Sequence, residues 1–198
     1  MQKSVQAGLM ESAAAGIIIF CWCYVILYWL ASKGRVKATA QRQSVASALA
    51  HRLPLAAGWF LMGGYIRHSP LNHLLTPATD PARVAGMVLC VAGFYFTIWA
   101  RRTLAGNWSS DVTLKQGHEL IRKGPYRIVR HPIYTGLLTM CLATAIAFGC
   151  VRFWLALPCW LVAFSIKIRQ EERLMLEHFP AEYPVYQKEV KALVPFVL

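Results

Sequence analysis

Two short groups of residues in the second half of the chain could bind a ligand or take part in catalysis. The first, Gly124 to Gly136, reads Gly-Pro-Tyr-Arg-Ile-Val-Arg-His-Pro-Ile-Tyr-Thr-Gly. Its initial Gly-Pro pair predicts a turn, and Pro132 restricts His131 to an extended backbone. A bent segment that carries Tyr126, Arg130 and His131 suits a polar ligand with a flat ring. The same residues are equally typical of an interfacial loop, in which arginine binds head groups and tyrosine joins the aromatic belt.

The second group is the pair Glu171-Glu172, which follows the last apolar run. Lys167 precedes Glu171 by four residues, so a helix would place these two side chains on one face. A solvated helix end with ordinary ion pairs is the simpler explanation. The position of the pair favours a functional role, because the chain has only nine acidic residues and these two adjoin each other at a membrane boundary.

The composition indicates an integral membrane protein. Of the 198 residues, 57% are hydrophobic and 15% are charged, whereas soluble domains carry about 25% charged residues. A short chain cannot bury this much apolar surface by itself, so lipid must cover part of it. The net charge of +12 is typical of the cytoplasmic excess of Lys and Arg near membrane spans. We therefore expect contact with membrane lipid and no nucleic-acid partner.

Five apolar runs predict an all-α protein with about five transmembrane or membrane-embedded helices. The last two runs predict a helical hairpin, and the amphipathic pattern from Lys167 onward predicts a C-terminal helix. We divide the chain into an N-terminal three-helix membrane region, 1–102, and a catalytic region, 103–198, with the polar loop, the hairpin and the C-terminal helix. The six cysteines lack the spacing of a zinc site, and no metal is expected. The apolar runs are 12–32, 45–66, 82–100, 132–149 and 153–166.

The distribution of basic residues predicts the orientation of these helices. If the N-terminus lies outside, sixteen Lys and Arg residues fall in the inside segments and four in the outside segments. Under the positive-inside rule, the polar loop and the C-terminus are then cytoplasmic, in the inner membrane if the protein is bacterial. The loop and the glutamate pair would thus share one side of the membrane and could form one site.

Taken together, these residues resemble the isoprenylcysteine carboxyl methyltransferase family and the related phospholipid methyltransferases. The resemblance extends from about Trp108 to Leu198. It includes the pattern Gly-x-Tyr-x-x-x-Arg-His-Pro-x-Tyr-x-Gly at Gly124 to Gly136, followed by the Glu-Glu pair. Its later members are Phe179, Tyr183, Tyr186 and Val194-Pro195-Phe196.

The resemblance implies an S-adenosylmethionine-dependent methyltransferase that acts on a lipophilic or lipidated acceptor. A carboxyl O-methyltransferase is favoured, with a prenylcysteine-like carboxylate as the acceptor and a lipid amine as the other possibility. Lys167 stands where the family uses an arginine for its substrate, and Glu172 and Arg130 complete the expected catalytic group. The lipophilic setting alone, and not the resemblance, leads us to expect that the acceptor enters between the third apolar run and the hairpin. The cofactor-binding positions that match the family are His118, Leu120, Ile121, Tyr126, His131, Pro132, Ile133, Tyr134 and Glu171.

Two other functions are compatible with the sequence. Membrane reductases that use NADPH, including the sterol reductases, resemble this family in the His-Pro-x-Tyr region, although the glutamate pair fits methyltransferases better. A small transport or scaffold protein whose loop binds head groups is the other. The acceptor is also open, because Lys167, Arg130 or Arg169 could hold a carboxylate, whereas Glu172 or His131 could take the proton of an amine. The sequence does not decide the oligomeric state.

Overall fold

The structure is a computed structural model of the chain. It describes the backbone of residues 2–32, 39–42, 44–64, 69–105, 113–115 and 119–195. Side chains are described for residues 8–32, 44–64, 69–105 and 119–195. His118, one of the predicted cofactor-binding residues, lies outside the described residues.

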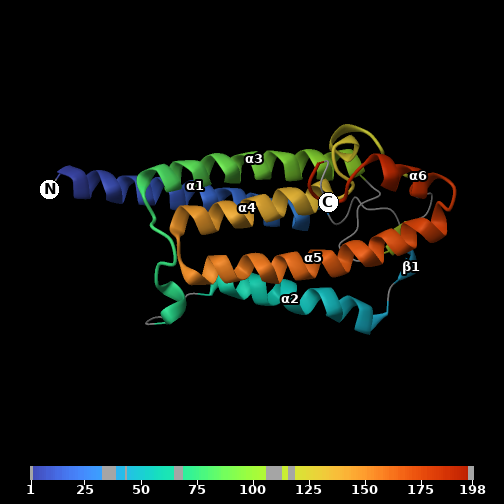
Figure 1. Cartoon of the computed structure of the whole chain (residues 1–198), viewed down its shortest axis with the longest axis horizontal. Helices are drawn as coiled ribbons and strands as arrows, with labels where there is room; N and C mark the ends of the chain where they lie inside the picture. Colours follow the sequence, from blue (N-terminus) through green and yellow to red (C-terminus); the bar gives the residue numbers. More distant parts are fainter. Residues whose placement is uncertain are drawn as a thin grey trace.

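The molecule is an all-α integral membrane protein, as the sequence predicts. Four of its helices are long and apolar enough to cross a membrane, and a fifth apolar helix is shorter (Figure 1). These helices correspond to the five predicted apolar runs, and three of the four long ones extend beyond their runs at one end or both. Their bounds are α1 Gln2–Ser32, α2 Val45–Gly63, α3 Asp80–Leu104, α4 Pro132–Phe148 and α5 Val151–His178.

The helices α4 and α5 form the predicted hairpin. Gly149 ends α4 with a φ of 68°, a left-handed conformation that glycine adopts without steric cost. The helix α5 does not end with its apolar run at Ile166, but continues through the glutamate pair to His178. A separate short helix, α6, follows at Glu182–Glu189. The glutamate pair is therefore part of the hairpin itself.

Close contacts between glycines and neighbouring backbone hold α3 against α4. A Cβ atom added to Gly93 would lie 2.7 Å from the carbonyl oxygen of Gly136, and one added to Gly136 would lie 2.1 Å from Oγ1 of Thr97. The two helices can approach this closely only because both positions lack a side chain. These contacts fill the interface between α3 and α4. The expectation that an acceptor enters between the third apolar run and the hairpin is therefore wrong for this interface.

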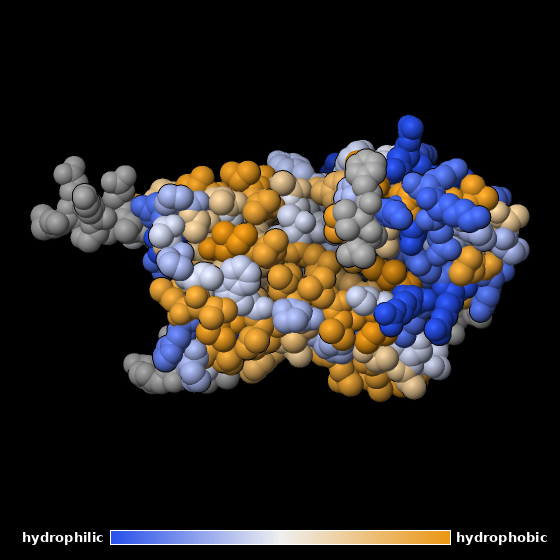
Figure 2. All heavy atoms as spheres, viewed as in Figure 1, coloured by the Kyte–Doolittle hydropathy of each residue, from blue (hydrophilic) through white to orange (hydrophobic). Residues whose placement is uncertain are grey.

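The polar segments gather at one end of the bundle. There β1, Thr39–Arg42, pairs antiparallel with β2, Thr113–Lys115, a contact that the sequence analysis did not predict. The helix α6 lies at the same end (Figure 1). Figure 2 shows hydrophilic residues concentrated at this end and hydrophobic surface along the helices. The loop before α4 and the glutamate pair thus share one end of the molecule, as predicted, whereas the membrane side that this end faces stays a prediction.

Candidate active site

The loop that precedes α4 is anchored by a buried tyrosine. Residues Gly124–Arg127 form a short 3-10 turn, η4, in which Tyr126 is buried. Tyr126 packs against Ala100 of α3 and Ile133 of α4, and Ile121 covers the same cluster. Burial raises the pKa of Tyr126 above its usual value, so its hydroxyl stays neutral. The turn therefore holds the following loop residues against the end of α3.

Glu171 lies at the centre of a polar cluster that joins α4 to α5. The Tyr134 hydroxyl donates a hydrogen bond of 2.6 Å to its Oε1 atom, and Lys167 Nζ lies 4.0 Å from the same oxygen. Its Oε2 atom lies 3.5 Å from Nδ1 of His131, a distance that is long for a hydrogen bond. Because the Glu171 side chain is 24% exposed, Oε2 is able to accept a hydrogen bond from a bound ligand.

Glu172 is bound more completely than its neighbour. The Arg130 atoms Nε and Nη2 lie 2.9 Å and 2.7 Å from its Oε1 atom, and Nε2 of His131 lies 3.1 Å from it. Gln187 of α6 donates a hydrogen bond of 3.0 Å to Oε2. Both oxygens thus have protein donors, so Glu172 ties the loop, α5 and α6 together.

His131 lies between the two carboxylates. Its ring is buried and parallel to the Tyr134 ring, with centroids 5.7 Å apart and an interplanar angle of 11°. Burial by itself lowers the pKa of His131, but the adjacent carboxylates of Glu171 and Glu172 outweigh burial, so the pKa is raised. We assign His131 as an imidazolium whose two N–H groups face the two glutamates, because each ring nitrogen faces an acceptor.

The chain that follows α6 crosses over the loop. We call residues 191–193 the C-terminal segment. Its carbonyl oxygens accept hydrogen bonds from the backbone N–H groups of Arg130 and His131 at 2.8 Å and 3.0 Å. The Thr135 hydroxyl donates a third, of 2.7 Å. The C-terminal segment therefore holds the backbone of the two site residues in place.

Two residues of α6 contribute to the site in a way that the sequence analysis missed. The Tyr186 hydroxyl donates a hydrogen bond of 2.6 Å to the carbonyl oxygen of Tyr126, and Gln187 binds Glu172. Burial raises the pKa of Tyr186 to about 12. A signal was present, because Tyr183 and Tyr186 are three residues apart in a polar helix and would share its buried face. Both are in fact buried.

A second contact that the sequence analysis missed connects α2 to α5 next to Lys167. His51 is buried, and its Nδ1 atom lies 3.0 Å from Oε1 of Gln170. The Gln170 amide nitrogen donates a hydrogen bond of 3.0 Å to the carbonyl oxygen of Ser47. Because the Gln170 nitrogen is the donor to Ser47, the atom that faces His51 is the Gln170 side-chain oxygen, which can only accept. The ring hydrogen of a neutral His51 is therefore assigned to Nδ1. From the sequence, His51 was only a polar residue near the start of an apolar run.

The structure brings most of the predicted site residues together. The predicted catalytic residues lie in the same polar cluster as the predicted cofactor-binding residues of the loop and of α5. Leu120 is half-buried at the beginning of the described loop, and Ile121 is half-buried against the Tyr126 cluster. Pro132 and Ile133 are buried in the first turn of α4. The members of the polar cluster are Arg130, His131, Tyr134, Lys167, Glu171 and Glu172.

Comparison with curated proteins finds relatives that are isoprenylcysteine methyltransferases by name. A protein-S-isoprenylcysteine O-methyltransferase of Saccharomyces cerevisiae is 32% identical over 126 residues, which are 61% of this chain and 52% of the yeast protein. A probable protein-S-isoprenylcysteine O-methyltransferase of Oryza sativa subsp. indica is 36% identical over 118 residues, or 57% of this chain and 60% of that protein. The chain thus spans between half and two thirds of the length of these relatives.

The comparison with protein families gives a match over the residues that build the site. The sequence model of the phospholipid methyltransferases matches residues 81–182. This range contains all but the first residue of α3, the loop with Arg130 and His131, α4, and α5 with both glutamates. The resemblance seen in the sequence motifs is thereby confirmed. Because the match covers more than half of the 198 residues, the chain belongs to the phospholipid methyltransferase family.

Proposed function

We propose that the protein is a membrane-embedded methyltransferase that uses S-adenosylmethionine and acts on a lipophilic acceptor, with a carboxylate as the favoured nucleophile. One observation carries the proposal: at the polar end of a membrane bundle, Glu171 keeps an oxygen available beside the stacked rings of His131 and Tyr134. Family membership and the names of the relatives support the same reaction class. In this proposal residues 103–198 form the catalytic region, and 1–102 the membrane region that supports it.

The described residues fit the groups of S-adenosylmethionine. A cofactor ammonium or ribose hydroxyl requires an acceptor, which Glu171 Oε2 provides, and a charge-assisted hydrogen bond is the stronger kind. Its adenine requires flat or apolar surroundings. The residues that would hold the cofactor are His118, Leu120, Ile121, Tyr126, His131, Pro132, Ile133, Tyr134 and Glu171. When bound, it supplies a methyl group on a sulfonium that departs as a neutral thioether, so the leaving group needs no acid.

The contribution of the protein is then orientation and exclusion of water. His131, held between two carboxylates and stacked on Tyr134, fixes the loop wall of the site. Arg130 is a positioning residue, because its guanidinium binds Glu172. The same guanidinium also donates a hydrogen bond of 3.2 Å to the carbonyl oxygen of Gln187. These contacts position the site before any ligand arrives, which is the condition for a rate gain from orientation.

Lys167 favours a carboxylate acceptor. Its side chain is 11% exposed, and its Nζ atom lies 5.6 Å from the ring centroid of Tyr134. A cation at this place would orient an anionic oxygen close to the Glu171 end of the site. A carboxylate is already ionised near neutral pH, so no group has to remove a proton from it before attack. An amine acceptor would instead need a base, and His131 as an imidazolium is unsuited to that role.

The test is methyl transfer from radiolabelled S-adenosylmethionine by the purified protein in lipid nanodiscs. Three acceptors are offered: a prenylcysteine analogue, the same analogue with its carboxyl amidated, and an extract of membrane lipid. We expect label in the first alone, as an ester that releases methanol in base. Lys167→Ala should raise the apparent KM for this analogue and leave cofactor binding intact. Base-stable label in the lipid extract would instead establish an amine acceptor, and stabilisation by NADPH but not by S-adenosylmethionine would contradict the proposal.

A further inference from the structure

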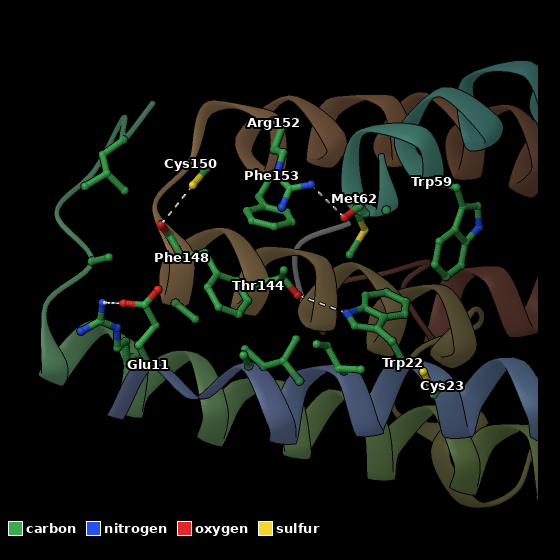
Figure 3. A pocket seen from close by; sticks show the side chains of 18 residues that line it. Glu11, Trp22, Cys23, Trp59, Met62, Thr144, Phe148, Cys150, Arg152 and Phe153 are labelled. Carbon is green, nitrogen blue, oxygen red and sulfur yellow. Dashed lines mark hydrogen bonds and ion pairs between the residues drawn. The ribbon is translucent and has the colours of Figure 1, made fainter. Parts of the chain in front are cut away.

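A cavity of about 620 Å³ lies at the beginning of α5, whereas Glu171 lies near the end of that helix. Figure 3 shows the side chains that line the cavity. Its walls come from all five apolar helices and from the connection between α2 and α3. Most of its lining is apolar, and Ile18, Phe148 and Phe153 are typical members. The volume lies within the range of about 300–1,000 Å³ that is usual for small-molecule sites. The cavity is therefore large enough for part of a lipid.

Packed aromatic rings separate this cavity from the proposed active site. Trp22 and Trp59, which line the cavity, have ring centroids 5.3 Å apart, and Trp160 lies 5.2 Å and 4.9 Å from them. Phe164 follows at 5.6 Å from Trp160, and Tyr134 at 4.6 Å from Phe164. Tyr134 is the residue that binds Glu171. An occupant of the cavity would consequently not share the site of methyl transfer.

One of the cations that line the cavity has no carboxylate partner in the described part of the chain. Arg152 Nη1 donates to the carbonyl oxygens of Met62 and Gly64 at 3.4 Å and 3.2 Å. Its guanidinium carbon lies 4.3 Å from the centroid of the Phe153 ring. Its Nε atom is buried and has no hydrogen-bond partner among the described residues. A half-buried cation beside apolar walls is costly unless an anion compensates it.

The other cation of the lining has carboxylate partners, which leaves Arg152 as the recognition point for an anion. Arg83 pairs with Glu11 at 2.9 Å and with Asp80 at 3.2 Å. The Thr144 hydroxyl, inside the cavity, accepts a hydrogen bond of 3.2 Å from Trp22 Nε1. Arg83 is thus neutralised by two carboxylates, whereas the charge of Arg152 meets only carbonyl oxygens and an aromatic ring.

We infer that this cavity binds one anionic membrane lipid, with its phosphate on Arg152 and a hydrocarbon chain between α1 and α5. The guanidinium of arginine matches the geometry of phosphate oxygens. The apolar walls give the hydrocarbon chain a surface about as apolar as the lipid tails that it leaves. The inference does not depend on the methyl-transfer reaction, because the site lies on the other side of the aromatic rings.

The first test measures retained lipid by native mass spectrometry. The protein in detergent is mixed with phosphatidylglycerol or with phosphatidylcholine of the same chains. We expect one phosphatidylglycerol per chain, with at least tenfold weaker retention of phosphatidylcholine. Arg152→Gln should weaken phosphatidylglycerol retention about tenfold, Arg152→Lys should restore most of it, and Arg173→Gln, an exposed position near the other end of α5, should change nothing. Equal retention of the two lipids, or equal losses in both Gln variants, would overturn the inference.

The second test asks whether the lipid chain occupies the cavity. Ala15→Phe fills space in the lining, and Ala13→Phe adds the same ring to an exposed position of α1. We expect the first variant to lose the lipid and the second to keep it, with equal helical content by circular dichroism. Dodecyl phosphate should compete with the lipid, whereas inorganic phosphate should not. If both Phe variants keep the lipid, or if inorganic phosphate competes as well, Arg152 binds an anion without the cavity and the inference fails.

Discussion

Tyr134, in the first turn of α4, donates a hydrogen bond of 2.6 Å to Glu171 of α5. This bond occupies one carboxylate oxygen and leaves the other directed at His131 from 3.5 Å. The two glutamates of the pair therefore differ in role: Glu171 has an oxygen left for a ligand, whereas Glu172 has protein donors on both. Two adjacent glutamates thus have different roles because they have different hydrogen-bond partners.

Glu171→Gln should weaken binding of S-adenosylmethionine by roughly ten- to a hundredfold. The substitution keeps the shape but removes the charge, and a hydrogen bond to a charged group contributes about 1.5–3 kcal/mol. Isothermal titration calorimetry on the purified protein measures this directly. Glu177→Gln, an exposed position on the same helix, is the matched control and should bind normally. Unchanged affinity in Glu171→Gln would leave that glutamate without a role in the cofactor site.

The raised pKa of His131 predicts a loss of stability in alkaline solution. A raised native pKa stabilises the fold most below the ordinary histidine value of about 6.5, and this contribution disappears as the pH rises through the native pKa. His131→Asn should therefore lower the thermal unfolding temperature more at pH 6 than at pH 9. Thermal scans in one detergent across this range are the measurement. His73→Asn, at an exposed position near the other end of the bundle, should show no such pH-dependent difference.

Gly136→Ala should destabilise the bundle by about 1–3 kcal/mol, the usual cost of overpacking a tight interface. The added methyl group would meet Thr97 Oγ1 at 2.1 Å and the Gly93 carbonyl oxygen at 2.7 Å, and the backbone oxygen cannot move without shifting α3. The measurement is the unfolding temperature in detergent. Gly16→Ala has no atom within 4 Å of the new methyl group and should be neutral or slightly stabilising. Equal unfolding temperatures for both variants would contradict the close contact of α3 with α4 at Gly136.

Tyr186→Phe should loosen the loop while leaving the helices inserted. The lost hydrogen bond to the Tyr126 carbonyl oxygen contributes about 0.5–1.5 kcal/mol to stability. Hydrogen exchange followed by mass spectrometry should show faster exchange in peptides that contain residues 124–131. Tyr95→Phe, whose side chain is 67% exposed, serves as the control and should exchange like the parent. Equal protection of the loop in both variants would contradict the anchoring role of α6.

Reporter fusions test the orientation. We expect fusions after Gln41, Asn72, Gln116 and Leu198 to read inside, outside, inside and inside, because the polar end of the bundle carries most of the basic residues. S-adenosylmethionine is a cytosolic metabolite, so the loop has to face the cytosol for the proposed reaction. An external reading at Gln116 would contradict the orientation and the cofactor together.

The helices were predictable because long apolar runs satisfy a simple length requirement. The end of α5 was not, since a helix can leave the membrane and continue in water without any change of backbone pattern, and the charges after Ile166 marked only the change of solvent. The pairing of β1 with β2 was equally hidden. Short strands from distant parts of a chain carry no local signal of their partner.

The site was predictable to the extent that side chains define it. His131, Tyr134 and Glu171 could be grouped through the motif and the resemblance, and the structure brings them into contact. The contribution of the C-terminal segment could not be foreseen, because it acts through carbonyl oxygens that every residue possesses. Glu172 illustrates the same limit. A glutamate that accepts a proton from a substrate and one that only holds the fold together look the same in a sequence. The contacts of Glu172 with Arg130 and Gln187 indicate the second role.

The C-terminal segment also determines when, during synthesis on the ribosome, the site can be completed. Leu193 binds Thr135, which the ribosome has made 58 residues earlier. Chains are synthesised from the N-terminus at about 5–20 residues per second, so α4 and α5 are complete before residues 191–193 emerge. A nascent chain that stalls after α6 therefore possesses every side chain of the polar cluster, yet lacks the carbonyl oxygens that accept from the backbone N–H groups of Arg130 and His131. Premature termination would therefore yield a chain with the complete polar cluster but without the backbone support of the C-terminal segment.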